Sequence, residues 1–322
     1  MTAAASIRLA DYTPWAFDLP EIALDVNIQS DHVVVASRLS LEPRRPGEPL
    51  VLYGVDLAIQ SLAIDQSPLQ SGDYRFADGL LTIANVPAQP FVLETCCRLD
   101  PYSNSSLEGL YASGGLLSTQ CEAEGFRRIS LHPDRPDVLS RWQVRIEASR
   151  SSCPVLLSNG NAVQEESVGA DRHAVTWDDP FPKPSYLFAL VAGDLREIRD
   201  LYTTASGRQV TLRLHVEEGD EPFTAHAMAS LKRSMQWDES VYNLEYDLDE
   251  YNIVAVRHFN MGAMENKSLN IFNSKLVLAD AETATDAELE RIESVIAHEY
   301  FHNWSEIGSP AGIGSSCRSK KA

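Results

Sequence analysis

The sequence has little positive charge: 27 lysines and arginines stand against 46 aspartates and glutamates, and the net charge is −19. A protein that binds the phosphate backbone of nucleic acids needs a basic face, so we expect no nucleic-acid partner. The chain also lacks the run of about 20 apolar residues that a membrane-spanning helix requires, because its most apolar stretches, 50–64 and 186–192, are too short or too interrupted. Residues 1–19 have no apolar segment behind a basic start, so we expect neither a signal peptide nor a membrane partner.

Cysteine is scarce as well. The five cysteines are odd in number, Cys96 and Cys97 are adjacent, and no pair has the C-x-x-C spacing. This usage favours reduced thiols over a disulfide framework, and we therefore expect a cytoplasmic protein. With 44% hydrophobic and 23% charged residues among 322, the composition is that of a globular chain with two domains or one large one.

The first 190 or so residues have the pattern of a mainly β domain. Short runs of alternating apolar and polar residues are separated by clusters of turn-forming residues, which predicts many short strands and favours a sandwich or an open saddle of sheets. The runs cover residues 22–28, 32–40, 50–57, 81–86, 91–99, 143–148 and 173–177.

The pattern becomes mixed after residue 194. We expect strands at 209–216, 251–256 and 269–278, a helix at 223–242, and a glycine-containing loop at 260–266. A second helix begins with Thr285 and Glu288, which have the spacing of a capping box, and Leu289, Ile292 and Ile296 follow at helical intervals.

His298, Glu299 and His302 on this second helix form an H-E-x-x-H motif. Histidines four residues apart lie on one helix face, so that both imidazoles can reach one zinc ion. Zinc lowers the pKa of water towards ~7, and the adjacent glutamate is placed to accept the proton while the water attacks a carbonyl. The alternative, which the motif alone leaves open, is two histidines on a helix face with no metal.

A second motif, Gly262-Ala263-Met264-Glu265-Asn266, precedes the helix. An enzyme that acts at the N-terminus of a peptide must recognise an α-amino group, whose pKa of about 7.7–8.0 leaves it mostly cationic at neutral pH. A fixed carboxylate such as Glu265 can anchor that amine, and the small Gly262 and Ala263 let a peptide backbone lie alongside as an added strand. Taken by its chemistry alone, the pentapeptide can also be a plain turn with an exposed glutamate.

The two motifs, about thirty residues apart, together resemble those of the gluzincin zinc aminopeptidases. The sequence around them resembles the bacterial aminopeptidase N family. The resemblance extends from the first strands to Trp304 and includes residues 120–126, 134–137, 181–184 and 189–194. It implies a saddle-like β-sandwich domain at 1–194 and, at 195–304, the incomplete start of an α+β thermolysin-like zinc domain.

The resemblance also implies roles for individual residues. His298 and His302 are expected to bind Zn2+, with Glu299 as general base. Glu265 is expected to anchor the substrate amine, with Glu122 as a second amine-binding carboxylate. Gln120 and Met261 match positions that line the first side-chain pocket. The expected substrates are peptides with a free N-terminus, and the expected state is a monomer.

The chain departs from the family after Trp304. In the family the third zinc ligand is a glutamate, found eighteen positions along when counting starts after Asn303. Here that position is Lys321, a cation that cannot coordinate zinc. Glu306 lies too far along the helix to replace it. Residues 305–322 do not resemble the family and have the composition of a disordered tail. One set of codons that encodes residues 305–322 gives the family's expected continuation when its first two bases are dropped. We therefore hypothesise that a frameshift after Trp304 produced this tail.

From these observations we expect a zinc aminopeptidase lineage in which this chain binds zinc weakly and has negligible turnover. The alternative is a non-catalytic remnant that binds peptides or a partner. A third interpretation, hydrolysis of an epoxide as in a gluzincin relative, is favoured by no residue here. Because the zinc domain is only begun, we also expect Leu289, Ile292 and Ile296 to lack packing partners, and the segment around them to be mobile.

Overall fold

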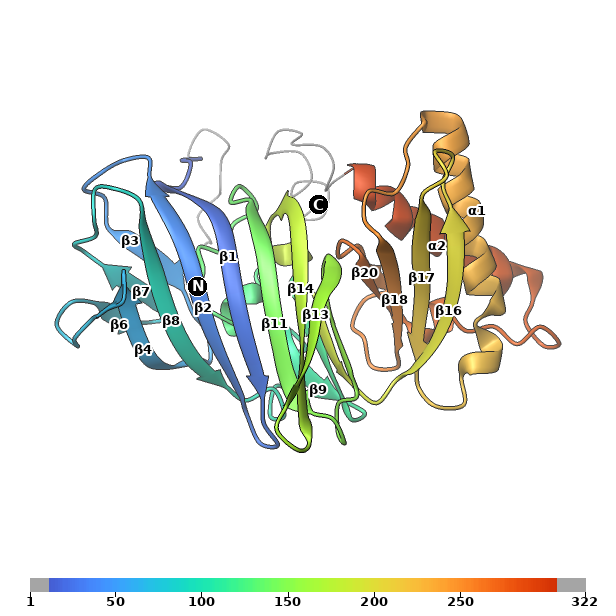
Figure 1. The fold of residues 1–322 in the computed structure, drawn as a ribbon, viewed down its shortest axis with the longest axis horizontal. Helices are drawn as coiled ribbons and strands as arrows, with labels where there is room; N and C mark the ends of the chain where they lie inside the picture. Colours follow the sequence, from blue (N-terminus) through green and yellow to red (C-terminus); the bar gives the residue numbers. More distant parts are fainter. Residues whose placement is uncertain (1–11, 306–322) are drawn as a thin grey trace, which may run out of the picture.

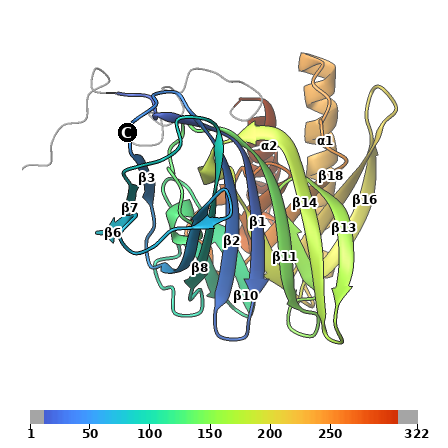
Figure 2. The same cartoon turned by 60° about the vertical axis from the view of Figure 1, so that its left-hand side comes forward.

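A computed structural model describes residues 12–305, in which a large β part is followed by a smaller part with two helices (Figure 1). The predicted tail, with Glu306 and Lys321, lies outside the described residues apart from Ser305. An eight-stranded sheet dominates the β part, and its long strands lie side by side in Figure 2. In spatial order it contains β13 (Asn161–Val168), β14 (Arg172–Lys183), β11 (Ser140–Ser149), β1 (Phe17–Ile28), β2 (Val33–Pro43), β8 (Phe91–Leu99), β4 (Ala58–Ile64) and β5 (Ser67–Pro68).

Two smaller sheets complete the β part. One has the order β12 (Val155–Ser158), β15 (Leu190–Gly193), β10 (Leu116–Gln120) and β9 (Gly109–Ser113), and the other has the order β3 (Leu50–Tyr53), β7 (Leu80–Ile83) and β6 (Arg75–Ala77). Alternate residues of β1, such as Ile22, Leu24 and Val26, are buried and share one hydrophobic core with residues of the smaller sheets. Because successive side chains of a strand point alternately into the core and away from it, the sequence pattern predicts these strands.

The smaller part is built on a five-stranded sheet. Its order is β16 (Arg196–Thr203), β17 (Gln209–Val216), β18 (Glu250–Val256), β20 (Leu269–Asn273) and β19 (Ala263–Met264). The central strand β18 is buried on both faces: Ile253 and Ala255 pack in the core with helices α1 (Ala225–Tyr242) and α2 (Asp286–Ser305), while Val254 and Val256 pack in the core of the β part. The sheet therefore lies between the two helices and the β part (Figure 1).

The helix that carries the metal motif begins as the sequence predicts. Thr285 and Glu288 form a reciprocal capping box, in which the Thr285 backbone N–H donates to Glu288 Oε2 at 2.8 Å and the Glu288 N–H donates to Thr285 Oγ1 at 3.3 Å. Asp286 and Glu288 also place negative charge at the positive end of the helix dipole. The start of α2, and with it the register of the motif, is thus fixed by local chemistry.

The fold class is confirmed as a mainly β part followed by an α+β part.

Three expectations about local structure and packing are wrong. Ile292 and Ile296 are 2% and 1% exposed and pack against α1 residues such as Leu231, so they do not lack partners. The strand predicted at 269–278 ends at Asn273, whose side-chain oxygen accepts from the Lys275 N–H and turns the chain. The loop predicted at 260–266 contains the short strand β19.

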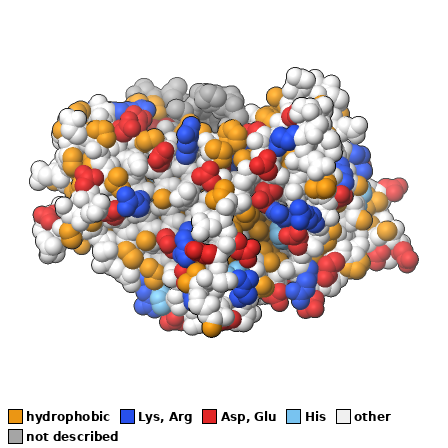
Figure 3. Space-filling view, viewed as in Figure 1, with side chains coloured by type: hydrophobic (Ala, Val, Ile, Leu, Met, Phe, Trp, Pro, Cys, Tyr) orange, Lys and Arg blue, Asp and Glu red, His pale blue; other side chains and the backbone are white. Residues whose placement is uncertain are grey.

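Neither helix of the described chain is long and apolar enough to cross a membrane. On the face drawn in Figure 3, basic side chains are scattered among acidic ones and form no continuous patch.

Candidate active site

Helix α2 brings the three residues of the H-E-x-x-H motif together. The Nε2 atoms of His298 and His302 lie 3.1 Å apart, and one ligand atom from each of His298, Glu299 and His302 falls within 4.8 Å of the others. His298 is exposed, His302 is half-buried, and Glu299 is 7% exposed. The two imidazoles therefore face the same point in space, with the glutamate beside them.

This arrangement fits zinc. Imidazole nitrogens bind zinc at about 2.0–2.1 Å in tetrahedral geometry, which puts two such nitrogens about 3.3 Å apart. The 3.1 Å separation of the imidazole nitrogens agrees with that value. Within residues 12–305 no other three histidine, cysteine or acidic side chains bring their ligand atoms as close together as this group does. The donors described are two nitrogens and a carboxylate, a set that borderline-soft zinc accepts.

The second motif lies next to this helix. Ala263 and Met264 form β19, which pairs with β20 and packs against α2, and the Gly262 carbonyl accepts from the Asn273 N–H at 2.8 Å. Glu265 follows directly and is only 3% exposed. This burial contradicts the alternative of a plain turn with an exposed glutamate, because a carboxylate is rarely buried without a partner or a role.

Residues from the β part meet the same loop. Gln120, at the end of β10, points its Nε2 to Met261 Sδ at 2.9 Å and to Met264 Sδ at 3.8 Å, and the carbonyl of Glu122 lies 3.5 Å from the same nitrogen. Gln120 is buried, Glu122 is half-buried and Met261 is 40% exposed. The structure thus brings Gln120, Glu122 and Met261 together at the junction of the two parts. The binding roles of these residues and of Glu265 stay predictions.

Buried aromatic and acidic side chains lie close to the motif on α2. The pKa of the Tyr251 hydroxyl is raised well above its usual value, first by burial and then by the charge of Glu299. Tyr251 and Tyr300 pack with ring centroids 5.6 Å apart. On α1, burial raises the pKa of the Asp238 carboxyl to about 6, and the nearby Trp304 lowers it by less. Glu299 is itself buried and lies close enough to the buried Tyr251 to affect its pKa, so its charge is poorly screened by solvent.

Sequence reasoning missed three polar residues beside the motif. Lys267 Nζ donates to Asp247 Oδ1 and Oδ2 at 2.9 and 2.8 Å, and to Asn303 Oδ1 at 3.0 Å. The one signal in the sequence was a lysine just before the strand predicted at 269–278. Its partners could not be named from the sequence, because they are 20 and 36 positions away in the chain.

A shallow apolar pocket of about 530 Å³ opens beside His298, between α1 and α2. It is lined by Trp237, Tyr242 and Phe301 together with Arg233 and Glu293, which form an ion pair at 2.7 Å. Trp237 is 52% exposed and contributes its ring to the wall of this pocket. The pocket places apolar surface directly next to one of the two histidines.

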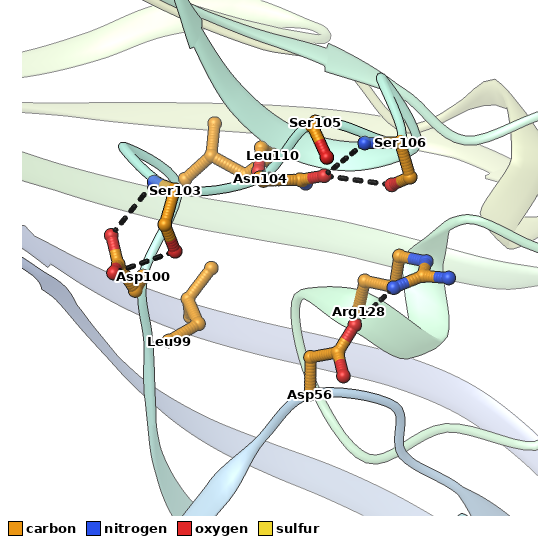
Figure 4. A pocket seen from close by; sticks show the side chains of 9 residues that line it. All are labelled: Asp56, Leu99, Asp100, Ser103, Asn104, Ser105, Ser106, Leu110 and Arg128. Atoms are coloured by element: carbon orange, nitrogen blue, oxygen red, sulfur yellow. Dashed lines mark hydrogen bonds and ion pairs between the residues drawn. The ribbon is translucent and has the colours of Figure 1, made fainter.

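Another pocket, of about 550 Å³, lies in the β part and shares no residue with the site (Figure 4). Its polar side chains already bond one another: Asp56 pairs with Arg128, Ser103 donates to Asp100, and Ser106 donates to Asn104. Because these groups satisfy each other, the pocket offers no converging unsatisfied groups of the kind that fix a ligand.

The described parts match models of one peptidase family. The Peptidase M1 N-terminal domain matches residues 20–187, and the Peptidase family M1 domain matches residues 226–306. The second match includes the H-E-x-x-H motif and the segment that contains Glu265.

Curated relatives and a solved structure point the same way. The chain is 55% identical over 303 residues to Aminopeptidase N of Caulobacter vibrioides, covering 93% of this chain and 35% of the relative. It is 49% identical over 296 residues to Aminopeptidase N of Escherichia coli, covering 92% and 34%. The crystal structure of Legionella pneumophila aminopeptidase A in complex with aspartic acid matches with a TM-score of 0.88 at 35% identity, over 93% of this chain and 36% of that one. The chain thus spans about a third of the length of these proteins.

Proposed function

The chain belongs to peptidase family M1, and on that premise we propose that its site is that of a zinc aminopeptidase, which removes N-terminal residues from peptides by hydrolysis. The observation that carries the proposal is the pair of imidazole nitrogens 3.1 Å apart with the Glu299 carboxylate beside them. Zinc, when bound between His298 and His302, supplies a Lewis acid that acidifies water and polarises the scissile carbonyl.

In this proposal the three acidic residues divide two tasks, proton transfer and binding of the substrate amine. Glu299 accepts the proton of the attacking water and passes it to the leaving amine, because it is the carboxylate that adjoins the histidines and it faces little competing solvent. Glu265 and Glu122 hold the cationic N-terminus of the substrate, since two carboxylates are more stable with an ammonium between them than alone. The first peptide bond is thereby placed at the histidines.

The position of β19 supports peptide binding. It is the edge strand of the five-stranded sheet, so one side of Gly262 and Ala263 is not paired within that sheet. An extended peptide can add to such an edge through backbone hydrogen bonds. In this proposal Gln120 and Met261, which contact each other next to this edge, also contact the first side chain of the substrate.

For the chain of 322 residues itself we propose weak zinc binding and low turnover. The described residues of the motif supply two zinc ligands, His298 and His302, because Glu299 acts as the base, whereas structural or catalytic zinc sites use at least three protein ligands. Lys321, which stands where the family resemblance places the third ligand, is a cation. The second candidate, a non-catalytic remnant that binds peptides or a partner, rests on this same lysine.

An assay of zinc content and hydrolysis tests the proposal. We expect the zinc-loaded chain to hydrolyse L-alanine 4-nitroanilide slowly, not to hydrolyse its N-acetyl form, and to lose the residual activity in Glu299→Gln, which removes the base and keeps the shape. Hydrolysis that survives Glu299→Gln contradicts the assigned base. Rapid hydrolysis contradicts the low turnover. Zinc that reaches about one ion per chain at saturation favours the enzyme, and no bound zinc at saturation favours the remnant.

We further propose a cytoplasmic, monomeric protein. The cysteines described, Cys96, Cys97, Cys121 and Cys153, are all free thiols, three of them buried. Burial raises the pKa of Cys97 to about 12, so this thiol stays protonated and unreactive at neutral pH.

A further inference from the structure

Lys267 is a fully enclosed ammonium group at the centre of four chain segments. Its side chain is 1% exposed. The ammonium donates to both carboxylate oxygens of Asp247, at 2.9 and 2.8 Å, and to Asn303 Oδ1 at 3.0 Å, and it lies 4.2 Å from the centre of the Phe181 ring. An ammonium group has three donors and is costly to bury without partners, so this environment satisfies it.

The partners of Lys267 connect the pieces of the proposed site. Lys267 is two residues after Glu265, and Asn303 is the residue after His302 on α2. Asp247 lies in the segment that leads into β18, and Phe181 belongs to β14 of the β part. One side chain thus joins the segment of the amine-binding glutamate to the helix of the zinc-binding histidines.

The backbone at Lys267 is held by hydrogen bonds from the β part. The Lys267 carbonyl accepts from Asn159 Nδ2 at 2.8 Å, and Ser268 Oγ accepts from the Gly160 N–H at 2.6 Å. Both partners lie at the turn between β12 and β13 of the β part. The segment after Glu265 can therefore not shift towards or away from α2 without breaking several buried hydrogen bonds.

We propose that Lys267 is a positioning residue, which sets the separation between the Glu265 carboxylate and the histidines of α2 so that a substrate amine and the scissile bond fit at the same time. The proposal rests on the proposed aminopeptidase function. A displacement of about 1 Å in such a site is enough to cost a large factor in productive binding. A purely structural ion pair, by contrast, would affect stability and leave no selective effect on amine binding.

The test compares amine binding with zinc binding in the same variants. The probe is L-leucinamide, titrated by calorimetry into the 322-residue chain at saturating zinc, with N-acetyl-L-leucinamide as the control that lacks the amine. The test variant is Lys267→Met, which keeps the length of the side chain and removes its charge and donors. The matched control is Lys232→Met on α1, where the lysine pairs with Asp200 in a more exposed position. Glu265→Gln reports independently whether the amine site exists.

We expect Lys267→Met to weaken L-leucinamide binding about tenfold or more while zinc affinity stays within about twofold, and Lys232→Met to change neither. The inference is overturned if Glu265→Gln weakens L-leucinamide binding and Lys267→Met does not, or if Lys267→Met lowers zinc and amine affinity in parallel. If the parent chain binds no L-leucinamide, or if Glu265→Gln has no effect, the proposed function itself fails. Should Lys267→Met not fold, Asp247→Asn weakens the same contact and is expected to show the same selective loss.

Discussion

Replacing His302 by alanine is expected to lower the affinity of the chain for zinc by more than about 100-fold, because it removes one of the two imidazoles that meet at 3.1 Å. One imidazole ligand, His298, then remains, because Glu299 is assigned as the base. The fold should persist, since the His302 side chain is half-buried and lies outside the hydrophobic core that contains Ile292 and Ile296. Competition titration with a chromogenic chelator measures the affinity, and circular dichroism checks the fold.

The matched control is His258→Ala. His258 is an exposed histidine in the same part of the chain, just after β18, and it is not a member of the metal-binding group. Its replacement should leave zinc affinity unchanged. Equal zinc affinity in His302→Ala and the parent chain would show that the metal binds elsewhere, and the site as described would then be wrong.

Replacing Gly160 by alanine is expected to destabilise the chain by at least about 3 kcal/mol. Gly160 has φ +93°, which side-chain-bearing residues rarely adopt, and a Cβ at this position would overlap the backbone of Asp178 and Asp179. Relief of the overlap must move the turn between β12 and β13, which holds Ser268 through the Gly160 N–H. Urea unfolding measures the loss of stability.

Gly169→Ala separates the two causes of this effect. Gly169 also has a positive φ, of +74°, but a Cβ there would meet nothing within 4 Å. We expect it to cost about 1 kcal/mol, the price of the backbone conformation alone. Similar losses at the two positions would mean that the contact with Asp178 yields easily, and that the turn does not hold the segment at Ser268 in place.

The sequence predicts the periodic elements well, for physical reasons that particular strands illustrate. Residues 91–99 alternate between buried and more exposed positions, and residues 209–216 do so until both faces are buried at the end of the segment. Both segments form strands with the predicted bounds. The start of α2 is equally predictable because Thr285 and Glu288 cap it locally. Signals that lie within a few residues of each other suffice for such elements.

Long-range packing accounts for what the sequence does not predict. The partners of Ile292 and Ile296 come from α1, about 60 residues earlier, and no local pattern names them. The same holds for the site: the H-E-x-x-H group is local to one helix turn, whereas Gln120 meets Met261 across 141 positions and Lys267 meets Asn303 across 36. The family resemblance supplied Gln120 and Met261, but nothing in it pointed to Lys267.

X-ray absorption at the zinc edge of the loaded chain tests the central claim most directly. If His298 and His302 hold the ion, the spectrum shows two imidazole nitrogens at about 2.0–2.1 Å, and one of them is lost in His302→Ala. A first shell made only of oxygen atoms, or one that contains sulfur at about 2.3 Å, would contradict the account, because zinc would then be bound by groups other than the motif on α2.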